Sequence, residues 1–365
     1  MESKLNKLSN LIVNYSLDLE KGERVLINAM SVKTSPLVMK LIDSIYAVGA
    51  IPFVRIYDNE ITNKLVKNTS PARIKEIVIQ KEDDNKNYDA FINVRYTENE
   101  YEGKDIESNI KADINNATKK VDKIRINERK WVLLNYPSIV DAYKAKMPFE
   151  QFSNYALDAM TYDYSQMKDK IIPLKRLMEK TDKVRILGPN TDISFSIKNM
   201  PIIPCLGTCN IPDGEMYTAP IKNSVNGVIS YNAPSAYSNN VFNNVRLTFK
   251  DGKIIDMTSD NDVDLLTEIF NTDEGSKYVG EFSLGFNPLI TKPVGDILFD
   301  EKISGSIHFT PGQCYTDANN GNDSGIHWDL VLIQTKEYGG GELYFDDVLV
   351  RKDGKFVLDE LKDLN

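Results

Sequence analysis

The sequence predicts an α/β protein, in which an N-terminal α/β domain with a mostly parallel sheet is followed by a strand-rich α+β domain. Three observations support this fold class. Helical patterns alternate with short apolar runs in the first part, an aromatic-rich helical segment follows residue 147, and short strand-like runs dominate from residue 183 onward. Because 365 residues are enough for about two domains, we expect one domain over residues 1–180 and another over residues 181–365.

The first predicted domain alternates helices with strands. Leu5, Leu8 and Ile12 recur at helical spacing, and a second helical pattern ends before Gly49. Polar helical segments separate the later strands. The helical patterns cover residues 5–13 and 36–46, and the strand-like runs cover residues 25–27, 51–56, 90–94 and 130–134. Such alternation is typical of a parallel sheet covered by helices.

The second predicted domain consists mainly of short strands. A helical stretch over residues 149–181 leads into it. Asp251 with Gly252, and Asp353 with Gly354, are tight-turn signals between strand-like runs. The clearest runs cover residues 184–187, 193–197, 245–249 and 328–333.

Composition and charge argue against several classes of protein. A net charge of -9 and a pI near 5.0, with no basic stripe, oppose binding to nucleic acid. Residues 1–26 contain no apolar run that resembles a signal peptide, and no stretch reaches the roughly 18–20 apolar residues of a membrane span. Three cysteines are too few for a disulfide framework, so free thiols are expected. We therefore expect a cytoplasmic protein with no nucleic-acid or membrane partner.

The only two histidines, His308 and His327, lie in the strand-rich half. In an extended segment, His327 and Asp329 point to the same side, so that both could bind one ion. Imidazole and carboxylate are good ligands for zinc, cobalt or manganese. The alternative is that each histidine is a hydrogen-bonded core residue.

Two glutamates also stand at positions that suit a site. Glu215 follows the turn-forming sequence at residues 210–214, and Glu281 lies between Gly280 and an apolar run. Local spacing leaves open whether these glutamates are ligands or solvated surface residues. Three carboxylates and two neutral imidazoles carry a formal charge of -3, which fits two divalent ions and one hydroxide better than one ion.

Several motifs, taken together, resemble the aminopeptidase T family of metallo-aminopeptidases, also called thermophilic aminopeptidases. The opening segments at residues 14–17 (NYSL) and 22–27 (GERVLI) are similar to the start of that family. More specific motifs follow in the order found in the family: residues 188–195 (GPNTDISF), 210–215 (NIPDGE), 218–220 (TAP), 280–285 (GEFSLG), 299–302 (FDEK), 305–308 (GSIH) and 326–329 (IHWD). The resemblance covers most of the chain.

The resemblance implies that residues 181–365 form a metal-binding catalytic domain. The implied ligands of two divalent ions, which could be zinc, cobalt, manganese or magnesium, are Glu215, Glu281, His308, His327 and Asp329. It further implies that Tyr315 lies in the active site, where its phenol could donate to the tetrahedral oxyanion. Glu215 or Glu281 could also pass a proton to the leaving amine. Removal of N-terminal residues from peptides with a free N-terminus, and a homodimer, follow as expectations.

Two departures from the family pattern concern substrate specificity and the ligand set. The chain is shorter than typical members, and the interval between the two histidines is compressed around residues 317–325, which we expect to border the substrate cleft. Glu301 is a further possible ligand, since it precedes His308 by seven residues on what could be the same strand. The alternative functions are a dinuclear metal phosphoesterase and a non-enzymatic, metal-stabilised binding protein.

Overall fold

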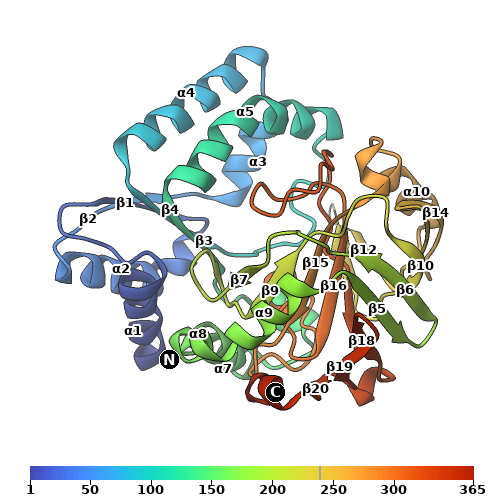
Figure 1. The fold of residues 1–365 in the computed structure, drawn as a ribbon. Helices are drawn as coiled ribbons and strands as arrows, with labels where there is room; N and C mark the ends of the chain where they lie inside the picture. The colour runs from blue at the N-terminus through green and yellow to red at the C-terminus, as the bar shows by residue number, and fades with distance from the viewer. Residues whose placement is uncertain (238–239) are drawn as a thin grey trace. The chain divides into compact units, whose positions relative to one another are not determined.

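The computed structural model describes residues 1–237 and 240–365, which divide into two compact units. The first unit contains residues 1–161 and 207–212, and the second contains residues 162–206 and 213–365. Each unit is shown within Figure 1. A boundary between independently folding domains at residue 180 stays a prediction. None of the helices in the described residues combines the length and the apolar character that a membrane span requires.

The first unit alternates helices with strands. Its helices are α1 (Glu2–Leu11), α2 (Ser35–Ala47), α3 (Asn59–Lys67), α4 (Pro71–Asn87), α5 (Ser108–Glu128), α6 (Ile139–Lys144) and α7 (Phe149–Met160). Its strands are β1 (Arg24–Ala29), β2 (Ile51–Ile56), β3 (Ala90–Arg95), β4 (Lys130–Asn135) and β8 (Asn210–Ile211). The strands pair in the order β2-β1-β3-β4-β8 and every pairing is parallel, which confirms the predicted parallel sheet.

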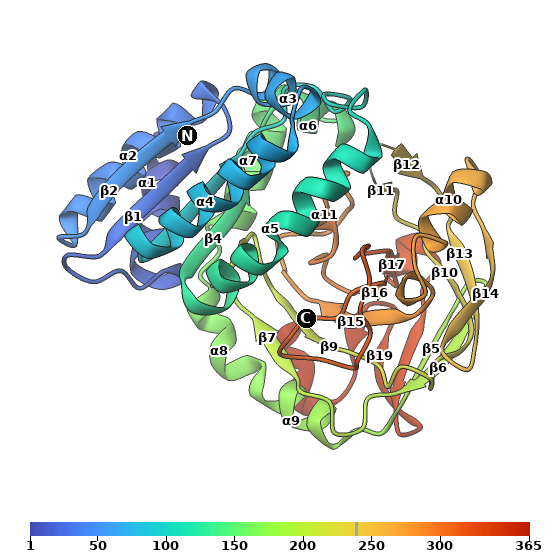
Figure 2. The same cartoon turned by 90° about the horizontal axis from the view of Figure 1, so that it is seen from above.

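Alternate residues of the strands face opposite sides of this sheet. Ala90, Ile92 and Val94 of β3 are fully buried on one side. Helices α1 and α2 lie on one face of the sheet, whereas α4 and α5 pack on each other over the opposite face (Figures 1 and 2). Helix α2 begins with Pro36 in its first turn and buries Leu37, Leu41 and Ile45 at helical spacing.

The second unit is rich in antiparallel strands. Its helices are α8 (Met167–Lys170), α9 (Ile172–Lys180), α10 (Val263–Phe270) and α11 (Ile297–Asp300). Its strands are β5 (Lys183–Gly188), β6 (Thr191–Ser196), β7 (Ile203–Cys205), β9 (Glu215–Thr218), β10 (Asn226–Ser230), β11 (Ser235–Tyr237), β12 (Asn240–Phe242), β13 (Arg246–Lys250), β14 (Lys253–Thr258), β15 (Val279–Gly285), β16 (Ser306–Pro311), β17 (Val331–Ile333), β18 (Glu342–Phe345), β19 (Val348–Lys352) and β20 (Lys355–Phe356). The predicted change from a helix-covered parallel sheet to a strand-rich α+β arrangement is therefore confirmed.

Two sheets of this unit share an aromatic core. One has the order β14-β13-β10-β6-β5-β18-β19-β20 and the other has the order β17-β16-β15-β9-β7. Phe195 of the first sheet lies 4.9 Å, between ring centroids, from both Phe282 and Phe309 of the second. Because side chains alternate along a strand, these rings leave Glu281 and His308 on the opposite face of the second sheet.

The tight turns form as predicted. Asp251 and Gly252 both have positive φ angles, 51° and 86°, and connect β13 to β14. Asp353 and Gly354, with φ angles of 49° and 76°, connect β19 to β20 in the same way. Two successive residues with positive φ match the twist of an antiparallel hairpin, which explains the Asp-Gly sequence at both turns.

The strand predicted over residues 328–333 is regular only from Val331 to Ile333, so this prediction is wrong for its first half. Residues 326–330 still run beside β16 through single hydrogen bonds, such as Trp328 N–H to the carbonyl oxygen of Pro311. The ladder is interrupted near Gly312, whose φ of 108° turns the backbone away from a regular strand.

We predict that Phe309→Ala destabilises the second unit by about 3–5 kcal/mol, because it removes a buried ring between two sheets. The measurement is urea unfolding followed by Trp328 fluorescence in a Trp131→Phe background, since these are the only two tryptophans. Ile255→Ala, at a side chain that is 59% exposed, is the control and should change the stability by less than about 0.5 kcal/mol. An equal shift of the unfolding midpoint in both variants would contradict the proposed core.

Candidate metal centre

Neighbouring strands place Glu281 and His308 side by side. In the pairing of β15 with β16, Ser283 lies opposite His308, and Glu281 precedes Ser283 by two residues on the same face. His308 Nε2 lies 3.1 Å from Glu281 Oε1. Both side chains are buried, so each needs a charged or hydrogen-bonding partner.

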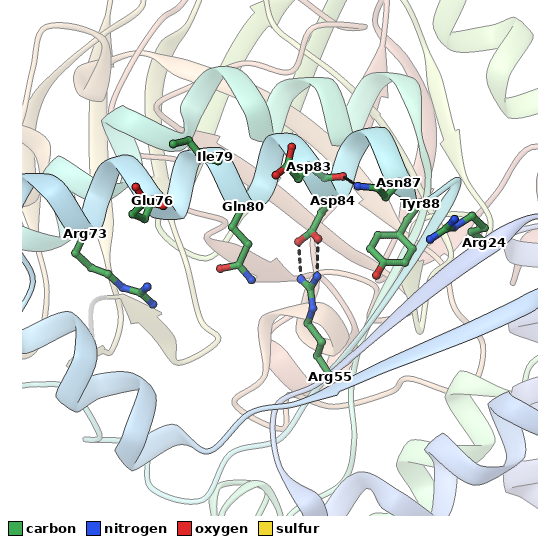
Figure 3. A pocket seen from close by; sticks show the side chains of 10 residues that line it. All are labelled: Arg24, Arg55, Arg73, Glu76, Ile79, Gln80, Asp83, Asp84, Asn87 and Tyr88. Atoms are coloured by element: carbon green, nitrogen blue, oxygen red, sulfur yellow. Dashed lines mark hydrogen bonds and ion pairs between the residues drawn. The ribbon is translucent and has the colours of Figure 1, made fainter.

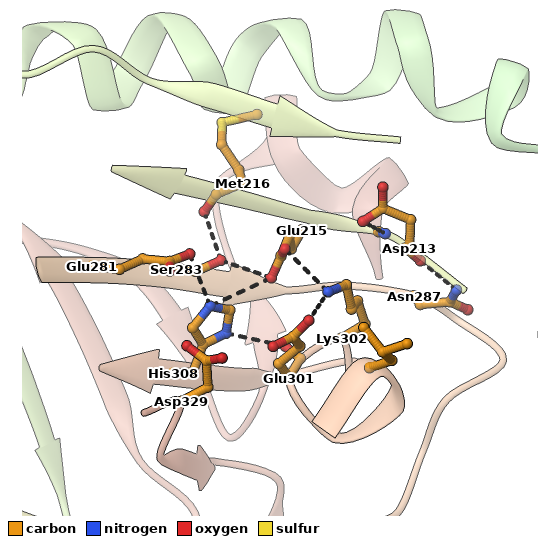
Figure 4. Close-up of polar contacts among 12 residues, drawn as sticks. Asp213, Glu215, Met216, Glu281, Ser283, Asn287, Glu301, Lys302, His308 and Asp329 are labelled. Atoms are coloured by element: carbon orange, nitrogen blue, oxygen red, sulfur yellow. Dashed lines mark hydrogen bonds and ion pairs between the residues drawn. The ribbon is translucent and has the colours of Figure 1, made fainter. Parts of the chain in front are cut away.

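Glu215 joins this pair from the first position of β9. Its backbone pairs with Gly285 of β15, and its Oε2 lies 3.5 Å from His308 Nε2. The Ser283 hydroxyl donates to the same oxygen at 3.2 Å. Figure 4 shows Glu215, Glu281 and His308 converging from their three strands. The turn predicted before Glu215 is present, with Gly214 at a φ of 122°.

His327 and Asp329 complete the cluster. His327 Nε2 lies 3.3 Å from Asp329 Oδ1 and 3.3 Å from Glu281 Oε2. Thr310 Oγ1 donates to Asp329 Oδ1 at 2.7 Å and orients this carboxylate. The shared side that the spacing of His327 and Asp329 predicts is therefore present. All five predicted metal ligands lie together on one sheet face, and their role as ligands stays a prediction.

Two glycines of β15 lie next to the cluster at positions where a side chain would not fit. A Cβ atom at Gly280 would lie 2.4 Å from the carbonyl oxygen of Gly312, and one at Gly285 would lie 2.5 Å from Ser306 Oγ. A larger residue would push β15 away from the backbone beside it. The glycines at both ends of the sequence from Gly280 to Gly285 therefore allow close packing around Glu281.

In both histidine rings, one nitrogen contacts a backbone carbonyl oxygen. His327 Nδ1 lies 2.7 Å from the carbonyl oxygen of Gln313, and His308 Nδ1 lies 3.3 Å from the carbonyl oxygen of Glu301. A carbonyl can only accept, so Nδ1 carries the proton in each neutral ring. The lone pair of each Nε2 then points toward carboxylates, and His327 Nε2 has no hydrogen-bond partner among the described residues.

Lys302 is a site residue that the sequence interpretation did not assign. Its side chain is 0% exposed, and its Nζ lies 3.2 Å from Glu215 Oε1 and forms an ion pair with Glu301. Figure 4 shows Lys302 between the two glutamates. A lysine next to a glutamate, inside a short motif that flanks a candidate ligand, is the signal that could have identified it.

Glu301 does not lie on the strand of His308, so that expectation is wrong. It follows helix α11, whose first turn is capped by the Asp296 side chain accepting from Leu298 N–H. Gly305, with a φ of 87°, then turns the chain into β16. Glu301 nevertheless reaches the cluster, because its carboxylate, an oxygen of Asp329 and a ring nitrogen of His308 lie within 4.8 Å of one another.

The cluster contains more negative than positive charge. With every carboxylate ionised and both imidazoles neutral, four carboxylates and the Lys302 ammonium give the cluster a formal charge of -3. Burial would lower the pKa of His308, but Glu215 and Glu281 outweigh it and raise that pKa to about 10. Burial raises the pKa of Glu301 to about 8, with Lys302 opposing the shift. In both cases the site favours added positive charge.

Cys205 and Tyr315 lie near the cluster. Cys205 pairs with Glu215 across β7 and β9, and its sulfur lies within 4.8 Å of carboxylate oxygens of Asp213 and Glu215. Cys205 is a free thiol, as expected, and it lies next to one of the predicted ligands. The Tyr315 ring lies 4.9 Å from that of His327, between ring centroids, and 46% of the residue is exposed.

The chemistry of the donor set fits divalent metal ions. Glu281, His327 and Asp329 form one group of donors within 4.8 Å, and Glu301, His308 and Asp329 form another. Imidazoles that donate Nδ1–H to a carbonyl and direct Nε2 toward carboxylates have the arrangement common among metal ligands. Net negative charge and the unpartnered Nε2 of His327 would both be satisfied by cations bound between these groups.

Three comparisons with known proteins bear on the family and the fold of this chain. The chain is 37% identical to Aminopeptidase AmpS of Bacillus subtilis over 110 residues, which are 29% of this chain and 26% of that protein. It is 32% identical to Aminopeptidase 2 of Geobacillus stearothermophilus over 167 residues, which are 40% of this chain and 37% of that protein. The matched segments thus span well under half of these relatives' lengths.

Two solved structures share the fold. Wild-type AmpT from Thermus thermophilus superimposes with a TM-score of 0.81 at 19% identity, over 98% of this chain and 99% of that chain. A 2,5-dihydroxypyridine dioxygenase from Pseudomonas putida KT2440 superimposes with a TM-score of 0.63 at 13% identity, over 99% of each chain. Since the names of these two proteins indicate different reactions, the fold alone does not define the chemistry.

A family model described as thermophilic metalloprotease (M29) matches residues 1–356. The match contains both halves of the fold and every residue of the cluster described above. The chain therefore belongs to the M29 family of thermophilic metalloproteases.

Proposed function

We propose that this protein is a metal-dependent aminopeptidase that hydrolyses the N-terminal peptide bond of peptides, using water activated by two divalent ions. The observation that carries the proposal is the convergence of two imidazoles and three carboxylates on one buried sheet face in an M29 family member. The names of the similar proteins, which include two proteins named aminopeptidase T, support the same activity.

The arrangement of Glu281 supports two ions rather than one. Its Oε1 faces His308 and its Oε2 faces His327, so one carboxylate connects two imidazoles. A carboxylate in this position can bridge two ions. The formal charge of -3 also fits two divalent ions with one hydroxide better than a single ion.

The residues of the chain have distinct proposed roles. Glu215, Glu281, His308, His327 and Asp329 would hold the ions, which could be zinc, cobalt, manganese or magnesium. Bound ions of this kind supply Lewis-acid chemistry, polarising a carbonyl and lowering the pKa of water. Glu215 or Glu281 is proposed to pass a proton to the leaving amine. The phenol of Tyr315 is proposed to donate a hydrogen bond to the oxyanion.

The substrates are proposed to be peptides with a free N-terminus. A cytoplasmic location and a homodimer, which the family resemblance implies, stay predictions. A phosphoesterase would need cations for the phosphoryl group, and the one lysine in the described cluster is already paired with Glu215 and Glu301. A non-enzymatic role of the metal predicts stabilisation by metal without turnover.

Removal of a ligand should abolish catalysis. We predict that His327→Ala and Asp329→Ala each reduce the release of p-nitroaniline from aminoacyl p-nitroanilides by about 100-fold or more, with cobalt, manganese or zinc present. Chelation should inactivate the wild type, and added metal should restore activity. p-Nitrophenyl phosphate, assayed in parallel, should not be hydrolysed. Undiminished peptidase turnover in both folded variants would refute the proposal.

The phenol of Tyr315 should act on the chemical step. We predict that Tyr315→Phe lowers kcat by about 10- to 100-fold with little change in KM or in bound metal, because only the developing oxyanion loses a donor. Tyr143→Phe, at a residue that is 84% exposed, is the control. Steady-state kinetics on leucyl p-nitroanilide give the comparison. A rise in KM at unchanged kcat would instead assign Tyr315 to substrate binding.

Removing the buried ammonium should make stability depend more strongly on metal. We predict that Lys302→Met lowers the Tm of the metal-free protein, since Glu215 and Glu301 lose a buried partner, a loss that typically costs about 3–5 kcal/mol. Cobalt or zinc should then raise Tm more than in the wild type, because the site is more negative. Lys253→Met, which removes a surface ion pair with Glu274, should change neither value. A metal-free Lys302→Met protein as stable as the wild type would contradict this role.

A further inference from the structure

The first unit contains a cavity of about 580 Å³ that the proposed peptidase site does not use. It lies between the parallel sheet and the helices α3, α4 and α5, and all its lining residues belong to this unit. A volume of this size suits a small organic ligand. The chemistry of its walls indicates which class of ligand the cavity suits.

The cavity is at the point of the sheet where ligands bind in related architectures. In the sheet order β2-β1-β3-β4, the chain adds β2 on one side of β1 and then adds β3 and β4 on the other side. The direction in which strands are added therefore reverses between β1 and β3. Asn28 and Met30 at the carboxyl end of β1, and Asn93 and Arg95 at the carboxyl end of β3, line the cavity. Open parallel sheets bind ligands outside the carboxyl ends of their strands at such a reversal.

A row of polar residues crosses the sheet at this position. Asn28 pairs in register with Arg55 of β2 and with Asn93 of β3, and Asn28 Nδ2 donates to Asn93 Oδ1 at 3.1 Å. A sheet face that packs directly against a helix is normally apolar. At this row of residues, the sheet face is therefore suited to contact a polar group of a ligand.

Helix α4 also turns polar residues toward the sheet. Its face toward the cavity carries Arg73, Gln80 and Asp84, and Asn85 is its only buried residue along the whole described helix. Figure 3 shows Arg73, Gln80 and Asp84 on one side of α4, with Asp84 bound to Arg55 through two contacts of 2.6 Å. A bidentate ion pair thus links this helix to β2 of the sheet.

Positive charge exceeds negative charge in the cavity wall. The charged lining side chains are four cations, Arg73, Lys81, Arg95 and Arg125, and two carboxylates, Asp84 and Asp122. Both carboxylates already have cationic partners, since Lys81 Nζ lies 2.9 Å from Asp122 and Arg55 holds Asp84. In a chain with a net charge of -9, this local excess favours an anionic ligand.

The remaining wall is apolar and contains an aromatic ring. Phe91, Trp131 and Leu133 of the sheet lie opposite Val66 and Ile77 of the helices. The Arg125 guanidinium stands 5.8 Å from the Trp131 ring centroid. An aromatic body placed against these residues would leave its charged group beside Arg125.

The loop after β1 disfavours a phosphate. Residues 30–35 contain no glycine that would let the backbone approach a phosphate group. Within this loop, Ser31 Oγ donates to Glu98 Oε1 at 2.6 Å, so a carboxylate of the chain already occupies its donor. The cavity wall, by contrast, offers guanidinium and amide donors that suit a carboxylate.

We propose that this cavity binds a small organic anion in which a carboxylate is attached to an aromatic body. Arg125 pairs with the carboxylate, the amides of Asn28 and Asn93 bind a polar substituent, and the apolar wall encloses the ring. The site is independent of the proposed peptidase activity. Its ligand can be a free aromatic acid or the C-terminal carboxylate of a peptide that ends in an aromatic residue.

The test uses the full-length, metal-loaded protein labelled with 5-fluorotryptophan. Only Trp131 and Trp328 are present, so fluorine NMR gives one resonance for each unit, assigned with Trp131→Phe. The probes are 3-phenylpropionate for a free acid, N-acetylphenylalanine for a peptide end, and N-acetylphenylalanine amide as the neutral control. The acetyl group removes the free amine that the proposed peptidase site requires.

We expect both carboxylates to shift the Trp131 resonance while the Trp328 resonance stays in place, and the tighter of the two to identify the source of the ligand. Arg125→Gln should weaken binding by about tenfold or more. Lys123→Gln, an exposed position of the same helix outside the cavity wall, should bind as the wild type does. No Trp131 shift up to about 10 mM acid, equal binding of the neutral amide, or unchanged affinity in Arg125→Gln would each overturn the proposal.

Discussion

Buried negative charge is the constraint on which the second unit depends. Glu215, Glu281 and Glu301 are removed from water, and a buried carboxylate without a cation or strong donors is unfavourable by several kcal/mol. The Ser283 hydroxyl donates to Glu215, and the buried Lys302 ammonium pairs with Glu215 and Glu301. The Thr310 hydroxyl donates to Asp329 of the same cluster. Negative charge still remains after these contacts. This remaining negative charge makes the cluster favourable for binding cations.

The fold was largely predictable because its signals are local. Alternating helical and strand-like patterns before residue 147 depend on side chains a few positions apart, and they correspond to the parallel sheet. Asp-Gly pairs identified two hairpins because positive φ angles restrict the residue types. The prediction was wrong where a regular strand is interrupted by tertiary contacts. Near Gly312 the backbone leaves the ladder, and no pattern within residues 328–333 indicates that.

The candidate site was predictable in composition but only partly in arrangement. The spacing of His327 and Asp329 places them on one side in any extended segment, and the chain has no further histidine. Glu215 and Glu281 needed the family resemblance, since their meeting depends on the register of β9 with β15 across 66 residues of chain. The contact of Cys205 with Glu215 depends in the same way on the pairing of β7 with β9, whereas Lys302 reaches Glu215 from the turn that follows α11. Strand register of that range is set by the packing of the whole sheet and leaves no local pattern.

The buried Lys302 has a consequence for how the protein matures. A metal ion must be acquired from solution, whereas this ammonium is part of the polypeptide and contacts Glu215 and Glu301 in the folded chain itself. Part of the positive charge that balances the buried glutamates is thus supplied by the polypeptide and not by bound ions. The newly synthesised chain does not need a supply of ions to neutralise every carboxylate while it assembles.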